Sequence, residues 1–153
     1  MRRHEILKRF AALTAAFVLV AGITAVSALA IASKTGNSPR SGALHVTKEC
    51  SEYTGVAFSF CTITSSSVNA LKVGSKVVYL QAPGATSLDS DIVIVVEPGK
   101  FAVGHVMLDF ASGTGELTIS GGIGPFSSFH AKADVSHLGG PDWAWDGRYR
   151  FGH

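Results

Sequence analysis

The sequence predicts an all-β domain behind an N-terminal export segment. From Tyr53 to Leu138, short apolar runs alternate with turn signals at intervals of about ten residues, which is typical of a barrel or a sandwich. After residue 33, no ten-residue stretch shows sustained helical periodicity. The predicted strands therefore form one β-rich domain.

Residues 1–32 are predicted to be a signal peptide. Its start is basic, with Arg2, Arg3, Lys8 and Arg9. Residues 10–32 carry no charge, and A-x-A cleavage patterns end at Ala30 and Ala32. The 23 uncharged residues could also span a bilayer, so an uncleaved membrane anchor is the alternative. Either outcome places the rest of the chain outside the cytoplasm, as a secreted or outward-facing anchored protein.

Residues 33–42 are polar and rich in Gly, Ser and Pro, which indicates a flexible leader. Residues 43–153 then form the predicted barrel domain, a length typical of one domain. Residues 1–30 contain four of the 13 Lys and Arg residues and one of the 11 Asp and Glu residues, so the net charge beyond them is −1. This balance gives no support to binding of nucleic acid or of a membrane surface by a cationic face.

The two cysteines, Cys50 and Cys61, are predicted to form a disulfide. Export places them in an oxidising compartment, and their separation of 11 residues suits two neighbouring strands or a strand and the loop before it. A reactive or metal-binding thiol pair is the alternative, but the chain has no C-x-x-C spacing and no adjacent His to favour it.

The predicted strands follow one another along the domain. Apolar and small residues alternate from Val56 to Cys61, and turn residues such as those at Ala82-Pro-Gly84 and Glu97-Pro-Gly99 end the later runs. These runs are residues 76–80, 91–96, 101–111, 114–120, 129–138 and 143–151.

The run Ile92-Val-Ile-Val-Val96 is apolar on both faces. An antiparallel strand with one solvated face alternates, so this strand must be covered twice. If Ile92, Ile94 and Val96 face the interior, Val93 and Val95 face outward. The leader is too polar to cover the outward valines. We therefore predict that a second copy of the chain covers them and that the protein is a homo-oligomer.

Glycines flank a short alternating strand at Gly113–Phe126. Leu117 and Ile119 share one face of this strand, while Gly113, Gly115 and the later glycines permit turns before Pro125. The segment Ile119-Ser-Gly-Gly-Ile-Gly-Pro-Phe126, followed by Ala131-Lys-Ala133, resembles the "I-x-G-G-T-G-x-F-x-x-A-x-G" segment of the allene oxide cyclase-like and dirigent-like barrel proteins. It departs from that segment in Ile123 for Thr, in Ala133 for Gly, and in one extra residue after Phe126.

This resemblance implies a closed antiparallel up-and-down β-barrel of about eight strands, preceded here by the signal segment. It also implies a trimer, since those families form one. No catalytic residue of either family can be matched to a position in this chain.

The last strand carries the candidate ligand-binding residues. One face of this strand carries four aromatic residues and a glycine, namely Trp143, Trp145, Gly147, Tyr149 and Phe151. The rings could fill the core, could line a cavity in which Gly147 leaves room for a small ligand, or could form a platform for a sugar. The sequence leaves these three interpretations open.

No recognised catalytic or cofactor motif occurs in the chain. Metalloprotease, nucleophile-elbow, EF-hand and phosphate-loop patterns are all missing, and we expect no cofactor. A metal site would require the fold to gather His105, His130 and His137, and none is expected. His105 and Asp109 share a strand face but lie about 13 Å apart along it, too far to pair.

Two classes of function fit these observations. The first is a secreted, non-catalytic barrel that binds a small hydrophobic or aromatic ligand or a partner protein. The second, which the resemblance implies, is a cyclase or isomerase resembling allene oxide cyclase, or a dirigent-like protein, that encloses a small hydrophobic substrate. A filled apolar interior favours binding, whereas a cavity of a few hundred Å³ with a buried Tyr, His or carboxylate favours the enzyme.

Overall fold

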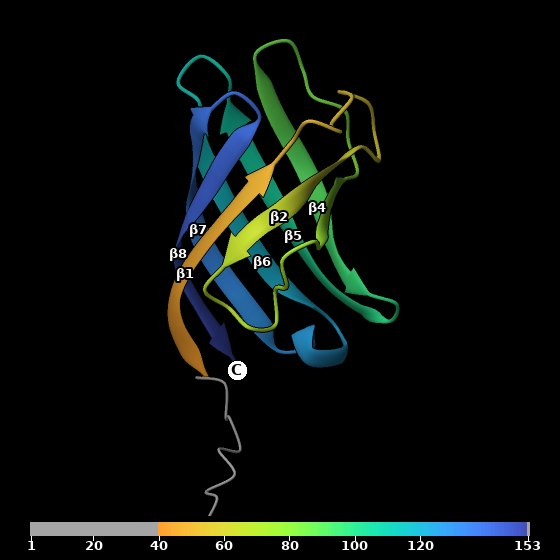
Figure 1. Ribbon diagram of the computed structural model, residues 1–153, viewed down its shortest axis with the longest axis vertical. Coiled ribbons are helices and arrows are strands. Elements are labelled where there is room, and N and C mark those ends of the chain that lie inside the picture. Colours follow the sequence, from red (N-terminus) through yellow and green to blue (C-terminus); the bar gives the residue numbers. More distant parts are fainter. Residues whose placement is uncertain (1–39, 153) are drawn as a thin grey trace, which may run out of the picture. The chain divides into compact units, whose positions relative to one another are not determined.

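The computed structural model describes residues 40–152, which form a closed antiparallel barrel of eight strands in sequence order (Figure 1). The strands are β1 (Ser41–Glu49), β2 (Phe60–Ser66), β3 (Lys76–Tyr79), β4 (Ser87–Glu97), β5 (Lys100–Asp109), β6 (Thr114–Ile123), β7 (Phe129–Gly139) and β8 (Asp142–Phe151). The predicted fold class is confirmed. The predicted signal segment and most of the leader lie outside the described residues, and β1 begins two residues before the expected domain boundary.

Pairing of the first and last strands closes the barrel. β1 and β8 run antiparallel from Ser41 opposite Arg150 to Glu49 opposite Asp142. The end of the barrel where β1 finishes and β8 starts also carries the Cys50–Cys61 bond, and we call it the disulfide end. The other end, at the bottom of Figure 1, holds the start of β1, the end of β8 and the 3-10 turn η1 (Gly124–Phe126). We call this the terminal end.

Side chains fill the barrel interior. Inward positions alternate with outward ones along each strand, as the pleat requires. The largest fully buried side chains include Trp145, Phe126, Phe129, Leu44, Ile63, Ile94 and Leu117. Because these rings and branched chains come from six of the strands and from η1, they form one continuous core.

The strand that is apolar on both faces, β4, has Ile92 and Ile94 on its inner face. Ile92 and Ile94 are buried in the core, while Val93 is half-buried and Val95 is 40% exposed on the outside. Outward neighbours extend this surface, because Val78, Val93 and Val103 lie side by side and Val95 lies beside Phe101. β4 therefore does present an apolar outer face.

The alternating run before Cys61 is not a strand as predicted. Residues 51–59 form an irregular loop, and β2 starts only at Phe60. Phe58 adopts a left-handed backbone with φ of 67°, and its N–H donates to the Tyr79 carbonyl at 2.7 Å. Val56 and Phe58 are exposed while Ser59 is buried, so the large apolar side chains of this run lie outside the core.

Glycines act in two different ways in this barrel. Gly113 supplies a positive φ of 65° at the turn before β6, as predicted. Gly147 lies where a Cβ atom would be 2.1 Å from the Lys132 carbonyl oxygen and 2.5 Å from the Ala133 Cα. The space at Gly147 is therefore taken by the backbone of β7, and the interpretation that it makes room for a ligand is wrong.

Candidate functional site

The most unusual side chain in the structure is Lys48. It follows Leu44 and Val46 on the inward face of β1, and only 4% of it is exposed. Lysine is rarely buried this deeply unless it is paired with a carboxylate. In residues 40–152, no carboxylate forms an ion pair with Lys48.

Sulfur atoms and aromatic rings surround the Lys48 amine in place of a carboxylate. Its Nζ lies 3.4 Å from the Cys50 Sγ and 3.8 Å from the Cys61 Sγ, and disulfide sulfurs are weak acceptors. The same Nζ lies over three rings, at 5.5 Å from Tyr79, 5.5 Å from Trp143 and 5.8 Å from Trp145. The predicted disulfide thus forms part of the wall of this site.

The protonation of Lys48 is set by two opposing effects. Burial penalises the ammonium form and lowers the pKa of Lys48 from 10.5 to about 7. The faces of the three rings attract a cation and offset part of that penalty. Near neutral pH the amine therefore exists in both its charged and its neutral form.

A cavity of about 80 Å³ adjoins this amine at the disulfide end, and we call it the Lys48 pocket. Its wall is mainly aromatic and aliphatic, and is made of Lys48, Cys50, Tyr53, Cys61, Tyr79, Leu88, Leu108, Phe110 and Trp143. Six strands and the 51–59 loop contribute side chains that lie far apart in the sequence.

Tyr53 brings the 51–59 loop against the pocket. Its N–H donates to the Cys50 carbonyl at 3.1 Å, and its ring packs edge-on to Tyr79 with centroids 5.2 Å apart. The buried Tyr53 hydroxyl has no hydrogen-bond partner among residues 40–152.

Both phenols of the pocket are held in their neutral form. Burial raises the pKa of Tyr53 and that of Tyr79. The nearby Ser59 side chain offsets part of this effect at Tyr53, although the Ser59 hydroxyl donates its own hydrogen to the Val56 carbonyl at 2.6 Å. Each tyrosine therefore keeps its proton near pH 7.

The structure separates the four aromatic residues that were predicted to bind a ligand. Trp143 lines the Lys48 pocket, and Trp145 is buried in the core beside the same amine. Tyr149 and Phe151 lie at the terminal end, where they line a second, larger hollow of about 380 Å³. The four side chains share one face of β8, as predicted, and this face points inward, but they do not share one cavity.

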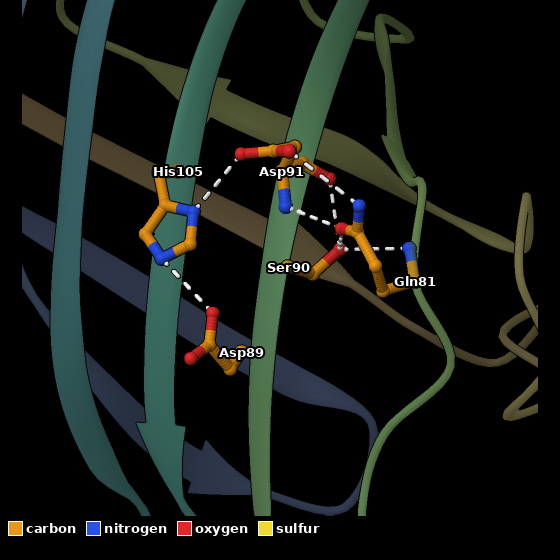
Figure 2. Close-up of polar contacts among 5 residues, drawn as sticks. All are labelled: Gln81, Asp89, Ser90, Asp91 and His105. Carbon is orange, nitrogen blue, oxygen red and sulfur yellow. Dashed lines mark hydrogen bonds and ion pairs between the residues drawn. The ribbon is translucent and has the colours of Figure 1, made fainter.

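The histidines weighed as metal ligands are not gathered. In residues 40–152, no three His, Cys, Asp or Glu side chains are arranged so that they could hold a metal ion. His105 instead pairs with two aspartates across the outer face of β4 and β5. Its Nδ1 lies 3.0 Å from the Asp91 carboxylate and its Nε2 lies 3.1 Å from that of Asp89 (Figure 2). Gln81 extends this cluster, since its Oε1 accepts from the Asp91 N–H at 2.6 Å. The cluster is exposed and joins β4, β5 and the segment before β4.

Sequence reasoning missed Lys48, although a signal for it was present. Leu44, Val46 and Lys48 keep the period of an inward face, and Lys48 stands two residues before a predicted disulfide. The His105 pairs were missed for another reason. Spacing along one strand excludes a contact with Asp109, but the partner Asp91 lies opposite His105 on the neighbouring strand, and only the register shows that.

The chain matches no protein family, no curated protein and no solved structure. No helix within residues 40–152 is long and apolar enough to cross a membrane. Function is therefore inferred from the Lys48 pocket itself.

Proposed function

We propose that this protein is a secreted, non-catalytic β-barrel that binds a small hydrophobic or aromatic ligand in the Lys48 pocket. The observation that carries the proposal is a buried amine without a carboxylate partner in the wall of an aromatic cavity. A titratable group with a strongly shifted pKa in an apolar pocket is typical of a ligand site. The two disulfide sulfurs are weak acceptors, and a ligand with an oxygen atom would supply the amine with a stronger one.

The size of the pocket limits the ligand. A volume of about 80 Å³ is several times smaller than the pockets that enclose drug-sized molecules. It suits a molecule of a few heavy atoms, or one end of a longer molecule whose remainder lies outside against Phe110. The rings of Trp143 and Tyr79 favour an apolar or aromatic body, and Lys48 favours an oxygen acceptor.

The filled interior favours binding over catalysis. Trp145, Leu117 and Ile94 occupy the centre of the barrel, where a cyclase-like protein would need to enclose its substrate. The eight-stranded closed barrel agrees with the fold that the resemblance to allene oxide cyclase-like and dirigent-like proteins implies. Membership of that family, and with it the cyclase, isomerase or dirigent alternative, stays a proposal that rests on residues 119–133.

Export is part of the proposal. The basic N-terminus and the uncharged run after it motivate export, and the Cys50–Cys61 disulfide is compatible with an extracellular location. N-terminal sequencing of protein recovered from the culture medium should find a start near Ile31 or Ser33. Full-length chain held in the membrane fraction would instead support the uncleaved anchor.

The binding proposal can be tested through the two tryptophan indoles. The chain contains two Trp residues, so their indole N–H signals in an NMR spectrum can be assigned with a Trp143→Phe variant. Titration with short alcohols and acids, such as propan-1-ol and propionate, should move the Trp143 signal in a saturable way. Lys48→Met should weaken propionate binding about ten-fold, whereas Lys132→Met on the outer face should not change it.

Two results would contradict the binding proposal. One is an unchanged Trp143 signal at millimolar ligand. The other is a response confined to residues around Tyr149 and Phe151, which would place the ligand at the terminal end.

A further inference from the structure

We propose that Lys48 binds small hydrophobic aldehydes covalently, as a reversible imine formed inside the Lys48 pocket. This inference rests on the proposed function of that pocket and names the class of ligand. In this inference the Lys48 Nζ forms a covalent bond to the ligand and not only a hydrogen bond.

The surroundings of the amine leave it available as a nucleophile. Lys48 forms part of the pocket wall, and its polar contacts in residues 40–152 are the two disulfide sulfurs at 3.4 and 3.8 Å. Neither sulfur holds the amine in its charged form as a carboxylate would. Lysines that act as nucleophiles toward carbonyl groups are commonly desolvated in hydrophobic pockets of this kind.

The reaction balances without any further reagent. The Nζ lone pair attacks the aldehyde carbon while the carbonyl π electrons move to oxygen. A proton then passes from nitrogen to that oxygen and gives a carbinolamine. Departure of the hydroxyl group with a second proton, as water, leaves the C=N bond. The amine and the aldehyde thus become an imine and one water molecule.

The imine suits the cavity, because a neutral imine removes the charge that burial disfavours.

Lys48 should react in preference to the exposed lysines. With a pKa of about 7, a substantial fraction of Lys48 is neutral at pH 7. An ordinary lysine, with a pKa near 10.4, is neutral in only about one molecule in 2,500 at that pH. Lower intrinsic nucleophilicity offsets part of this difference, so we expect a preference of about ten-fold or more.

Reductive trapping tests the inference. The exported, disulfide-bonded protein is incubated at pH 7 with propanal and sodium cyanoborohydride, and the adduct is located by intact mass and peptide mapping. We expect an N-propyl group at Lys48, formed about ten times faster than at Lys72, Lys76, Lys100 or Lys132. The Lys48 rate should level off above a pH of about 7, whereas the exposed sites should keep accelerating to higher pH.

Matched variants sharpen this test. Lys48→Met should remove the fast adduct, and Lys132→Met should leave it unchanged. Circular dichroism of each variant checks that the barrel remains folded.

The outcomes distinguish this inference from the proposed function. If propan-1-ol moves the Trp143 indole signal but propanal leaves Lys48 unmodified, the imine is wrong and the binding pocket stands. If neither compound is bound, both proposals are wrong. Adducts spread over the exposed lysines with Lys48 spared would also overturn the imine.

Discussion

Among single residues, two positions carry a conformational or electrostatic cost. Lys48 keeps an amine in an apolar interior, and Phe58 keeps a large side chain on a left-handed backbone with φ of 67°. Lys48 lies in the wall of the pocket, and Phe58 lies on the 51–59 loop, whose Tyr53 lines the same pocket. Each cost can be measured by a substitution that removes it.

Lys48 should make the stability of the protein depend on pH. Its pKa is about 7 when folded and 10.5 in the unfolded chain, so between these values the unfolded state binds the extra proton. The free energy of unfolding should therefore rise with pH from about 7 upward, and the full penalty should persist below 7. Burial raises the pKa of Tyr79, which works in the opposite direction above about pH 10, where unfolded tyrosine ionises.

The Lys48→Met variant isolates this effect. It should lose the rise between pH 7 and 10. At pH 6 it should be more stable than the parent protein by a few kcal/mol, because each pH unit between the folded and unfolded pKa values is worth about 1.4 kcal/mol. Urea unfolding at pH 6, 8 and 9.5 measures both differences. Parallel curves for the two proteins would show that Lys48 is not desolvated in solution.

The Phe58→Gly variant should be more stable toward unfolding than the Phe58→Ala variant. A left-handed backbone costs an L-residue about 1–2 kcal/mol, and glycine avoids this cost. The Phe58 side chain is 70% exposed, so both substitutions lose little burial. Part of this gain is lost because glycine has more conformational entropy in the unfolded chain. We therefore expect the free energy of unfolding in urea to be about 1 kcal/mol higher for Phe58→Gly than for Phe58→Ala. Equal stabilities would place Phe58 in an unstrained conformation.

Between strands, close backbone approach and one covalent link hold the barrel in register. β7 and β8 run together with Ala133 opposite Gly147, where no Cβ atom fits. The Cys50–Cys61 bond ties the residue after β1 to β2 beside the pocket. Each contact makes its own prediction.

Gly147→Ala should strongly destabilise the barrel. The added methyl group would be 2.1 Å from the Lys132 carbonyl oxygen, and a paired backbone cannot yield as a flexible side chain can. Overpacking of this kind costs about 1–3 kcal/mol or more. Gly84→Ala is the control, since its nearest new contact is 3.4 Å away and its backbone is not left-handed. Similar melting temperatures for the two variants would contradict this account of β8.

Removal of the disulfide should lower stability by about 3 kcal/mol on the chain-entropy view of a short loop. The Cys50→Ser, Cys61→Ser double variant tests this in urea, and intact mass with and without reductant tests whether exported protein contains the bond. Two free thiols in exported, unreduced protein would show that the bond does not form.

The barrel as a whole has two unlike ends and one apolar outer face. The disulfide end carries the Lys48 pocket, and the terminal end carries the hollow at Tyr149 and Phe151. Outside, Val78, Val93 and Val103 lie side by side on β3, β4 and β5. This face bears on assembly, whereas the disulfide end bears on ligand binding.

Self-association through this face stays a prediction. Val95 is 40% exposed beside Phe101, so Val95→Lys would place a charge within the apolar face. If copies associate there, as a trimer in the resembling families, the variant should form smaller particles in light scattering and keep its circular dichroism spectrum. Thr118→Lys on the outer face of β6 is the control. A parent protein that is monomeric at micromolar concentration would contradict the prediction.

Reading the sequence alone was enough to predict the strand-rich architecture, the shared aromatic face of the last strand and the pairing of the cysteines. These features are local, because alternation with period 2, turn residues and a single cysteine pair can be recognised without knowing which strands are neighbours. Local alternation failed at residues 56–59, where a positive φ at Phe58, a residue type that rarely adopts it, interrupts the predicted strand.

The site, in contrast, exists only once the barrel has closed. The Lys48 amine, the Cys61 sulfur and the rings of Tyr79 and Trp143 come from β1, β2, β3 and β8, and closure brings them together. Desolvation depends on everything that packs around a group, so the lowered pKa of Lys48 cannot be inferred from its neighbours along the chain. The same holds for His105 and Gly147, whose partners are set by strand register.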